Sequence, residues 1–275
     1  MSNKVLKPKK ASLYQFTQKY SNNIDNCIEF FKSMKWPEGF SCDRCGCHKY
    51  YLVKRVGKTK TSYVLECSSC HKQHSLLSGT IFQSCKLDLY KLLLGIFLFF
   101  NENKGISAVD LCSILDVNYK TALLLENKCR ILMSLSNSDK LLNSPFYEAD
   151  VFNIGAKSKN KAGRASEQQP ILGILSTDKE NNYPRFIKLR VITDYTGLSL
   201  KKNIEKCCVL SHDALLNTDG EKGFNTLNEE IQVKNEKISY EEKDHRLLWL
   251  NIIIGNIKNN ITGIYHGITK REMPL

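Results

Sequence analysis

The spacing of hydrophobic residues changes at Phe146 and divides the chain into two parts. Before this point, apolar side chains recur every three or four positions over residues 12–34 and 87–122, which predicts helices. After it, apolar residues form short runs bounded by polar and Gly-containing stretches, which predicts strands. The pattern therefore predicts a mainly helical N-terminal part and a C-terminal part built on a sheet.

The first predicted helix covers residues 12–34 and ends before Pro37 and Gly39, which both interrupt helices. A Lys-rich stretch, residues 4–10, precedes it and is predicted to be a disordered arm. We expect this helix to cover the segment that follows it.

Two alternating runs, residues 50–53 and 62–65, predict the strands of a small antiparallel ribbon. The runs lie between two pairs of cysteines, and the members of each pair are two residues apart: Cys42 and Cys45, and Cys67 and Cys70. Four thiolates in two tight pairs can surround one tetrahedral Zn²⁺. We therefore predict a structural zinc site in preference to free thiols or a redox pair.

Cys47, His48 and His71 lie close enough in sequence to serve as alternative ligands, but the four-cysteine set is already complete. We interpret these three as surface residues. The other cysteines have no such spacing and are interpreted as small core side chains: Cys27, Cys85, Cys112, Cys129, Cys207 and Cys208.

A strongly apolar segment, residues 87–100, is followed by two predicted helices joined by a short turn at residues 116–118. Ser107 is placed to cap the first helix, and Asn118 the second. Tyr119, Lys120 and Thr121 open the second helix, as in a DNA-reading helix-turn-helix. Taken alone, this pattern favours an ordinary helical hairpin, because the helix-turn-helix signal is weak.

The C-terminal part contains four predicted strands: 146–154, 171–176, 186–192 and 214–216. A helix near residues 198–207 separates the third strand from the fourth, and another helix follows at residues 249–258. This order describes a mixed sheet covered by helices, an α+β arrangement that matches a ribonuclease-H-like core.

Three polar positions in this part predict a metal site. Asp150 stands in the middle of a buried strand, and Asp219 follows a second apolar run directly before Gly220. Asn251 and Lys258 are seven residues apart, which places them on one face of a helix. Without further information, Asn251 is interpreted as a plain helix-surface residue.

Composition limits the partners of this site. The chain has 275 residues and a net charge of +12, from 40 Lys and Arg against 28 Asp and Glu, which favours a polyanion such as nucleic acid. The basic loop 157–164 could follow a phosphate backbone or form a solvated hairpin tip. Eleven cysteines without a signal peptide indicate an intracellular setting, and the longest apolar run is too short to span a bilayer.

Several short motifs in this order carry a resemblance to a known family. Besides the cysteine pairs, they are QHSLLSGTIF at 73–82, KGISA at 104–108, YKTA at 119–122, NTDGEKGF at 217–224 and GIYHG at 263–267. Together they resemble the ISXO/Merlin-type insertion-sequence transposases, from about Ser12 to the C-terminus. The resemblance implies a zinc ribbon and a helix-turn-helix that hold double-stranded transposon ends, followed by a catalytic domain that joins them to target DNA as a homo-oligomer.

The resemblance also implies roles for the polar positions. Asp150 and Asp219 are the first two ligands of a pair of Mg²⁺ or Mn²⁺ ions, Asn251 takes the third place, and Lys258 is the basic residue two turns on. Asn256 is the second choice for the third ligand. Phosphodiester transfer needs two such hard cations, so the chemistry agrees with the ligand types.

The chain departs from the family pattern at three places. Val151 stands where a second acid usually follows the first, and residues 167–169 lack the usual Lys. The family continues beyond the motif that contains His266 into a further helix, whereas this chain ends at Leu275, so we expect a catalytic domain truncated at its C-terminus.

We therefore expect four segments: an N-terminal arm and helix (1–38), a zinc ribbon (39–84), a helix-turn-helix-like segment (85–142) and a ribonuclease-H-like transposase domain (143–275). The favoured function is DNA transposition, in the nucleus of a eukaryote or the nucleoid of a bacterium. The alternative is a decayed or host-recruited copy that only binds DNA through its zinc-dependent segments. A zinc-ribbon transcription-type factor is a third hypothesis, which the paired strand acids argue against.

Overall fold

A computed structural model describes residues 11–57, 61–102, 105–138, 141–155, 168–178, 183–228, 230–235 and 247–265 of the 275-residue chain. The chain divides into two compact units, residues 1–134 and 135–275. The Lys-rich arm, the basic loop 157–164, Lys104, Glu167 and His266 lie outside the described residues. The four expected segment boundaries stay predictions.

Unit 1 begins with two helices where one was predicted. They are α1 (Leu13–Tyr20) and α2 (Ile24–Lys35). The prediction of a single helix over residues 12–34 was wrong because Asn23 adopts an extended conformation and its side chain accepts a hydrogen bond from the backbone N–H of Asn26. An Asn that caps the next helix in this way ends the preceding one.

The zinc-ribbon segment is a three-stranded antiparallel sheet in the order β1–β2–β3. Its strands are β1 (Tyr50–Val56), β2 (Thr61–Cys67) and β3 (Gln73–Ser75). The two predicted strands are confirmed, and they pair from Tyr50 opposite Cys67 to Val56 opposite Thr61. The short β3 was not predicted, because three residues are too few to display an alternation.

The ribbon is followed by α3 (Leu89–Asn101), α4 (Ala108–Leu115) and α5 (Tyr119–Ser138). Both predicted caps are confirmed: Ser107 Oγ accepts from the N–H of Asp110, and Asn118 Oδ1 accepts from the N–H of Thr121 at 2.9 Å. Asp116 ends α4 in the left-handed conformation, with φ of 49°. The turn between α4 and α5 is therefore tight and locally determined.

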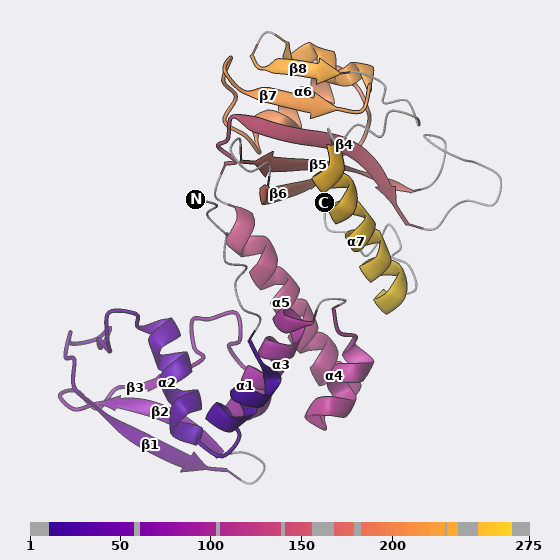
Figure 1. Cartoon of the computed structure of the whole chain (residues 1–275). Helices are drawn as coiled ribbons and strands as arrows, with labels where there is room; N and C mark the ends of the chain where they lie inside the picture. Colours follow the sequence, from indigo (N-terminus) through magenta and orange to yellow (C-terminus); the bar gives the residue numbers. More distant parts are fainter. Residues whose placement is uncertain are drawn as a thin grey trace, which may run out of the picture. The chain divides into compact units, whose positions relative to one another are not determined.

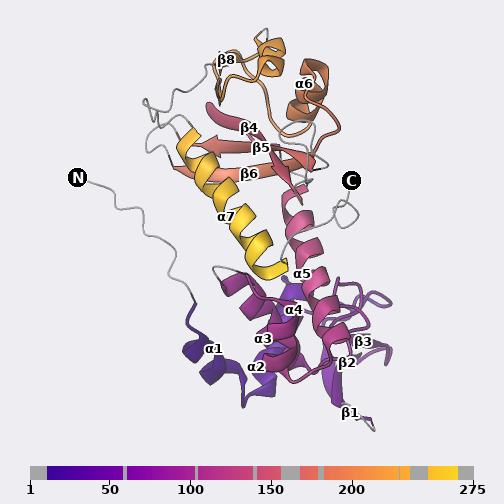
Figure 2. The ribbon, with the colours of Figure 1, turned by 90° about the vertical axis from the view of Figure 1, so that its right-hand side faces the viewer.

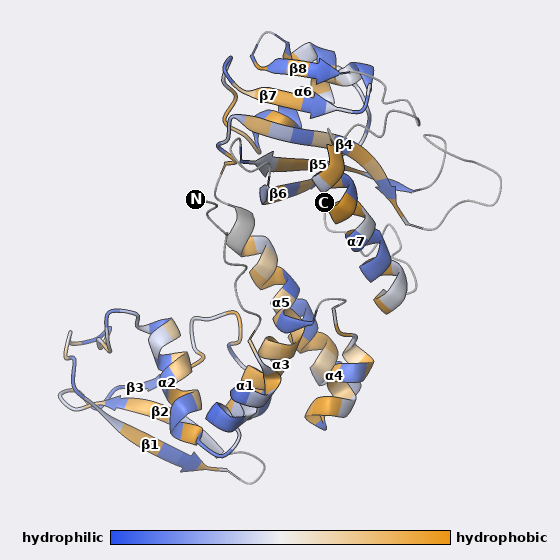
Figure 3. Cartoon of the chain, in the orientation of Figure 1, coloured by the Kyte–Doolittle hydropathy of each residue, from blue (hydrophilic) through white to orange (hydrophobic). Residues whose placement is uncertain are grey.

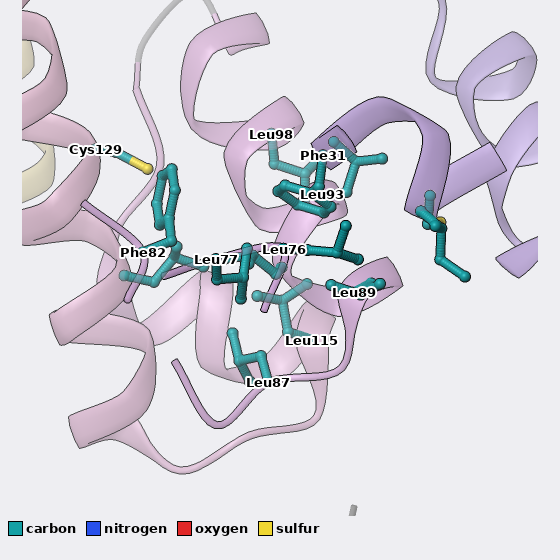
Figure 4. Packing of buried hydrophobic residues seen from close by; sticks show 14 of the residues in the cluster. Phe31, Leu76, Leu77, Phe82, Leu87, Leu89, Leu93, Leu98, Leu115 and Cys129 are labelled. Atoms are coloured by element: carbon teal, nitrogen blue, oxygen red, sulfur yellow. The ribbon is translucent and has the colours of Figure 1, made fainter. Parts of the chain in front are cut away.

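One hydrophobic core runs through unit 1. Figure 4 shows its side chains from α2, the ribbon-to-helix loop, α3, α4 and α5 meeting around Leu76 and Leu93. Phe31 and Leu89 join the same cluster as the buried cysteines Cys42 and Cys67. The helices thus pack on the cysteine-bearing ribbon, as expected for a covering N-terminal segment.

Unit 2 is built on a five-stranded mixed sheet with the order β6–β5–β4–β7–β8 (Figure 1). The strands are β4 (Phe146–Ile154), β5 (Gln169–Thr177), β6 (Pro184–Val191), β7 (Leu215–Thr218) and β8 (Gln232–Asn235). Strands β4, β5 and β6 are antiparallel neighbours, whereas β7 is parallel to β4 and β8 is parallel to β7. The four predicted strands are confirmed, and β8 was missed because it is short and polar.

Helices cover both faces of this sheet (Figure 2). On one face, α6 (Gly197–Glu205) and the short 3₁₀ helix η2 (Lys222–Leu227) pack on Tyr147, Ala149 and Leu216. On the other face, α7 (Leu248–Tyr265) packs on β4 and β5. Figure 3 shows bands of hydrophobic and of hydrophilic residues along α7, and its buried residues Leu250 and Ile254 are one turn apart, as in an amphipathic helix. The α+β class is therefore confirmed.

No helix among the described residues combines the length and the hydropathy needed to cross a membrane.

Candidate functional site

The parallel pairing of β4 and β7 brings Asp150 next to Asp219. Phe146 pairs with Leu215, and Glu148 pairs with Asn217. Continuing this register by two residues places Asp150 opposite Asp219, directly after the last residue of β7. Two acids that are far apart in sequence therefore meet at the C-terminal end of β7.

Both acids lie on the sheet face that α7 covers. Side chains alternate between the faces of a strand. Phe152 belongs to the cluster with Leu250 of α7, so Asp150, two positions earlier, shares that face. Leu216 belongs to the core beneath α6, so Asp219, three positions later, points to the α7 side.

The turn that carries Asp219 is held by Asn235 at the end of β8. Thr218 Oγ1 donates to Asn235 Oδ1 at 2.7 Å, and Asn235 Nδ2 donates to the carbonyl of Glu221 at 2.8 Å. Gly220 has φ of 94°, a conformation that favours glycine. Asn235 of β8, a strand that was not predicted, therefore fixes the position of Asp219, an acid that was predicted.

Burial and, after it, the charge of the neighbouring Asp219 together raise the pKa of Asp150 to about 6. The N–H of Val151 and the charge of Lys258 oppose this shift. Two carboxylates that share a site repel each other, and a cation relieves that repulsion. The pair is thus electrostatically suited to a positive ion.

Helix α7 brings Lys258 to the acid pair. Leu250 and Ile254 point into the core between helix and sheet, and Lys258 Nζ lies 5.5 Å from the ring centre of Phe152. Asn251 is exposed and stands two turns before Lys258, on the same side of the helix. Asn256 lies about 160° around the helix from Lys258. The geometry therefore aligns Asn251, and not Asn256, with Lys258.

Glu148 is a third acid on this face, and sequence reasoning missed it. Its side chain is 3% exposed, and Oε2 accepts a hydrogen bond from the N–H of Leu250 at 2.8 Å. Burial raises the pKa of Glu148 to about 7, while the hydrogen bond from Leu250 lowers it. Glu148 thereby attaches the first turn of α7 to β4. Strand alternation alone, two residues before Asp150, could have placed it on this face.

Gly173 faces Asp150 across the antiparallel pair of β4 and β5. A Cβ atom at this position would lie 3.2 Å from Cε1 of Phe152 and 3.4 Å from Cδ1 of Leu250. The glycine therefore leaves the room that lets α7 approach the sheet beside the acid pair.

The four predicted zinc ligands come together in unit 1. The Sγ atoms of Cys42, Cys45, Cys67 and Cys70 all lie within 4.8 Å of one another. The Sγ atoms of Cys42 and Cys70 are 3.6 Å apart, and those of Cys45 and Cys67 are 3.5 Å apart. Thiolates are soft ligands that suit Zn²⁺, and four of them complete a tetrahedral structural site.

The two cysteine loops have the same backbone turn. The N–H of Gly46 donates to the carbonyl of Cys42 at 2.8 Å, and the N–H of His71 donates to that of Cys67 at 3.0 Å. Both donors have positive φ, 70° at Gly46 and 57° at His71. Each short loop is therefore folded to direct both of its sulfurs to one point.

The alternative ligands have other partners. Cys47 Sγ lies 3.5 Å from the Ser68 hydroxyl, His48 Nδ1 lies 3.0 Å from the carbonyl of Phe40, and the exposed His71 contacts a carboxylate. His74, which sequence reasoning did not consider, is buried with Nε2 3.4 Å from Cys42 Sγ.

The six remaining cysteines behave largely as predicted. Cys85 and Cys112 are half-buried and pack against the core of unit 1. The other four are fully buried: Cys27, Cys129, Cys207 and Cys208.

Two adjoining hollows in unit 1 share Lys86. One, of 510 Å³, lies between β2 and the start of α3 and includes Lys91. The other, of 360 Å³, is lined by Lys120, Thr121 and Lys128 at the start of α5. Four lysines in adjoining hollows create a local positive field.

Comparison with known protein families found a similarity in part of unit 1 and another in most of unit 2. Residues 144–274 match the ISXO2-like transposase domain. Over just under half of its length, the chain is therefore similar to a transposase domain. Residues 23–73 match the transposase zinc-ribbon domain. A search of curated proteins found no match.

The ISXO2-like transposase match contains both acids, Asn251 and Lys258, and the zinc-ribbon match contains all four ligand cysteines. The ISXO2-like part of the resemblance is thus supported, and the link to Merlin stays a prediction.

Proposed function

We propose that this protein is a DNA transposase that cuts transposon ends and joins them to target DNA by metal-dependent phosphoryl transfer. The observation that carries the proposal is the pairing of Asp150 with Asp219 on one face of the sheet. The transposase domain match over the same residues supports it independently. The proposal includes action as a homo-oligomer on DNA.

The sheet supports a ribonuclease-H-like assignment of unit 2. Three antiparallel strands come first in the chain, and two further strands then extend the sheet in parallel from the first of them. The acid in the middle of β4 and the acid after β7 lie on adjacent strands. This arrangement concentrates carboxylates at one position of a rigid sheet, as a phosphoryl-transfer site requires.

The donor atoms fit a hard divalent cation. Carboxylate oxygens of Asp150 and Asp219, with the amide oxygen of Asn251, are ligands that Mg²⁺ and Mn²⁺ accept. When bound, such ions activate a water or 3′-hydroxyl and stabilise the leaving oxygen. Asp150, Asp219 and Asn251 are the residues that would hold these ions. A neutral Asn leaves one negative charge fewer than a third acid would.

Lys258 is assigned to a phosphate of the bound DNA. Its charge already acts on Asp150, so a phosphate at the acid pair would lie within its field. A Lys ammonium acts as a point charge and tolerates variation in phosphate position. Its role is to attract and orient the DNA strand.

We propose that unit 1 holds the DNA through α4 and α5 and the lysine-lined hollows. Tyr119, Lys120 and Thr121 form the first turn of α5, where a recognition helix meets the major groove. Lys86 and Lys120 are exposed beside this turn and suit phosphates on either side of it.

Salt dependence of binding tests the role of unit 1. In a metal-free buffer, the affinity for a 20-base-pair duplex is measured at several salt concentrations. The slope of log affinity against log salt concentration should become shallower by about 1 for Lys86→Gln and for Lys120→Gln. Lys202→Gln, on α6 of unit 2, is the matched control and should leave the slope unchanged. Equal slopes for all variants would remove the hollows from the DNA surface.

A strand-cleavage assay tests the catalytic proposal. With duplexes that carry inverted terminal repeats sought in the DNA flanking this gene, we expect nicking that requires Mg²⁺ or Mn²⁺. Asp150→Ala and Asp219→Ala should each lower the rate by more than about 100-fold, since metal ions contribute several kcal/mol to such transition states. Asp213→Ala, at an exposed turn before β7, should retain wild-type rates.

One feature favours a second candidate, a copy that binds DNA without cleaving it. We assign the third ligand position to the neutral Asn251, which weakens metal binding until the substrate phosphate supplies oxygens of its own. End binding with no metal-dependent nicking in the wild-type chain would support this candidate over the transposase.

A further inference from the structure

We propose that His74 is a fixed hydrogen-bond donor to Cys42 in the outer shell of the zinc centre and that this contact slows the loss of the metal. The inference concerns metal retention and goes beyond the proposed DNA chemistry. It rests on the buried position of His74 and on the direction of its ring.

The position of His74 is set by β3 and by aromatic packing. His74 pairs with Leu65 across the β2–β3 ladder, and its side chain is 7% exposed. Its ring makes edge contacts with Phe40 and Trp36, at centroid distances of 5.4 and 6.3 Å. These contacts restrict rotation of the ring and keep Nε2 directed at Cys42 Sγ, 3.4 Å away.

The chemistry of a metal-bound thiolate decides the direction of this hydrogen bond. A thiolate on Zn²⁺ has no proton and can only accept, so Nε2 must carry the proton and donate it. A donor of this kind removes charge density from the sulfur and stabilises the bound state, as outer-shell partners of metal ligands generally do.

His74 is separate from the ligand set. The four cysteine sulfurs form one mutually close group, and His74 belongs to a second group with Cys42 and Asp43. Its Nδ1 lies 3.8 Å from Asp43 Oδ1, which is too far for a hydrogen bond, and Asp43 is itself held by Lys72 at 2.8 Å. His74 therefore lies beside a charged pair at the surface without being hydrogen-bonded to it.

The experiment measures zinc release to an excess of a chromogenic chelator from the purified full-length protein. His74→Phe keeps an aromatic ring for Phe40 and Trp36 but removes the hydrogen-bond donor. This variant should release zinc about 10-fold faster than the wild type, which is the lower end of the range of effects seen when an outer-shell partner is lost. His74→Gln restores a donor at a similar reach and should recover most of the loss.

His71→Asn is the matched control. His71 is exposed, follows Cys70 directly and contacts Glu66 rather than a cysteine. Asn tolerates its positive φ, so the variant should release zinc at the wild-type rate. Wild-type release from His74→Phe, or equal acceleration in the control, would overturn the proposal.

Two measurements on the wild-type protein keep the proposal testable if His74→Phe does not fold. The ¹⁵N shifts of the His74 ring in the zinc-loaded protein should show a protonated Nε2. The absorption spectrum of the Co²⁺-substituted protein should be that of four sulfur ligands. An unprotonated Nε2, or a spectrum of three sulfurs and one nitrogen, would show that His74 is a ligand and would contradict the inference.

Discussion

The zinc centre and the acid pair are both sites of clustered ligands, but they are assembled by different means. Each half of the zinc centre is a short loop with its own turn, and only the pairing of the two loops depends on the ribbon. Asp150 and Asp219 have no local relation and meet only because β4 and β7 are paired in one register. The first site is thus encoded mainly by local sequence, and the second by the sheet.

The two sites should therefore respond differently to damage. Loss of a zinc ligand removes a cross-link from the core of unit 1, whereas loss of an acid removes charge repulsion and leaves the sheet paired.

Cys67→Ala should have the largest effect. Cys67 is fully buried in the core of unit 1, and structural zinc sites contribute directly to folding. We expect zinc content to fall to background and the unfolding transition of unit 1 to be lost, with the transition of unit 2 retained. Calorimetry and metal analysis measure both.

Cys85→Ala, at a half-buried cysteine outside the ligand set, is the control and should keep the zinc. A Cys67→Ala protein with an unchanged melting profile would show that the zinc centre does not hold unit 1 together.

Removal of the Glu148 acceptor should come next. Glu148→Ala leaves the buried N–H of Leu250 without a partner, a loss of about 1–3 kcal/mol. Because α7 carries Asn251 and Lys258, we expect faster hydrogen exchange at Leu250 together with slower nicking. Glu148→Gln retains an acceptor and should behave nearly as wild type. Identical exchange at Leu250 in all three proteins would contradict this role.

A glycine pair should show effects of opposite sign. Gly173→Ala places a methyl group against Phe152 and Leu250. It should destabilise unit 2 by about 1 kcal/mol, which is the lower end of the range of costs for an overpacked core. Gly255→Ala adds a methyl group in α7 with no atom within 4 Å, so it should stabilise by roughly 0.5–1 kcal/mol. Urea unfolding measures both. Equal effects would mean that α7 does not approach the sheet at Gly173.

The same difference between the sites explains what the sequence could predict. The cysteine spacing predicted the four sulfurs that cluster in the structure, and hydrophobic patterning predicted β4 residue for residue. Side-chain caps at Ser107 and Asn118 were predictable because each acts within three residues.

The features that sequence reasoning missed depend on contacts between distant segments. Glu148 gains its role from Leu250, which approaches it from α7. His74 is brought to Cys42 by the pairing of β3 with β2. Strand β8 forms by extending a sheet that the other strands already make. The break between α1 and α2 was missed for another reason, since the apolar spacing continues through Asn23 and hides its capping role. The pairing register of strands and the contacts between distant segments are set by the whole fold. The order of hydrophobic and polar residues along the chain carries little information about them.

The most direct test of the paired acids is the pKa of Asp150, measured by carboxyl ¹³C NMR in zinc-loaded protein without Mg²⁺ or Mn²⁺, with and without Asp219→Asn. Because the charge of Asp219 raises the pKa of Asp150, we expect a value of about 6 in the wild type and a clearly lower value in the variant. Asp213→Asn should leave it unchanged. An Asp150 pKa that does not respond to Asp219→Asn would place the two carboxylates apart and contradict the account.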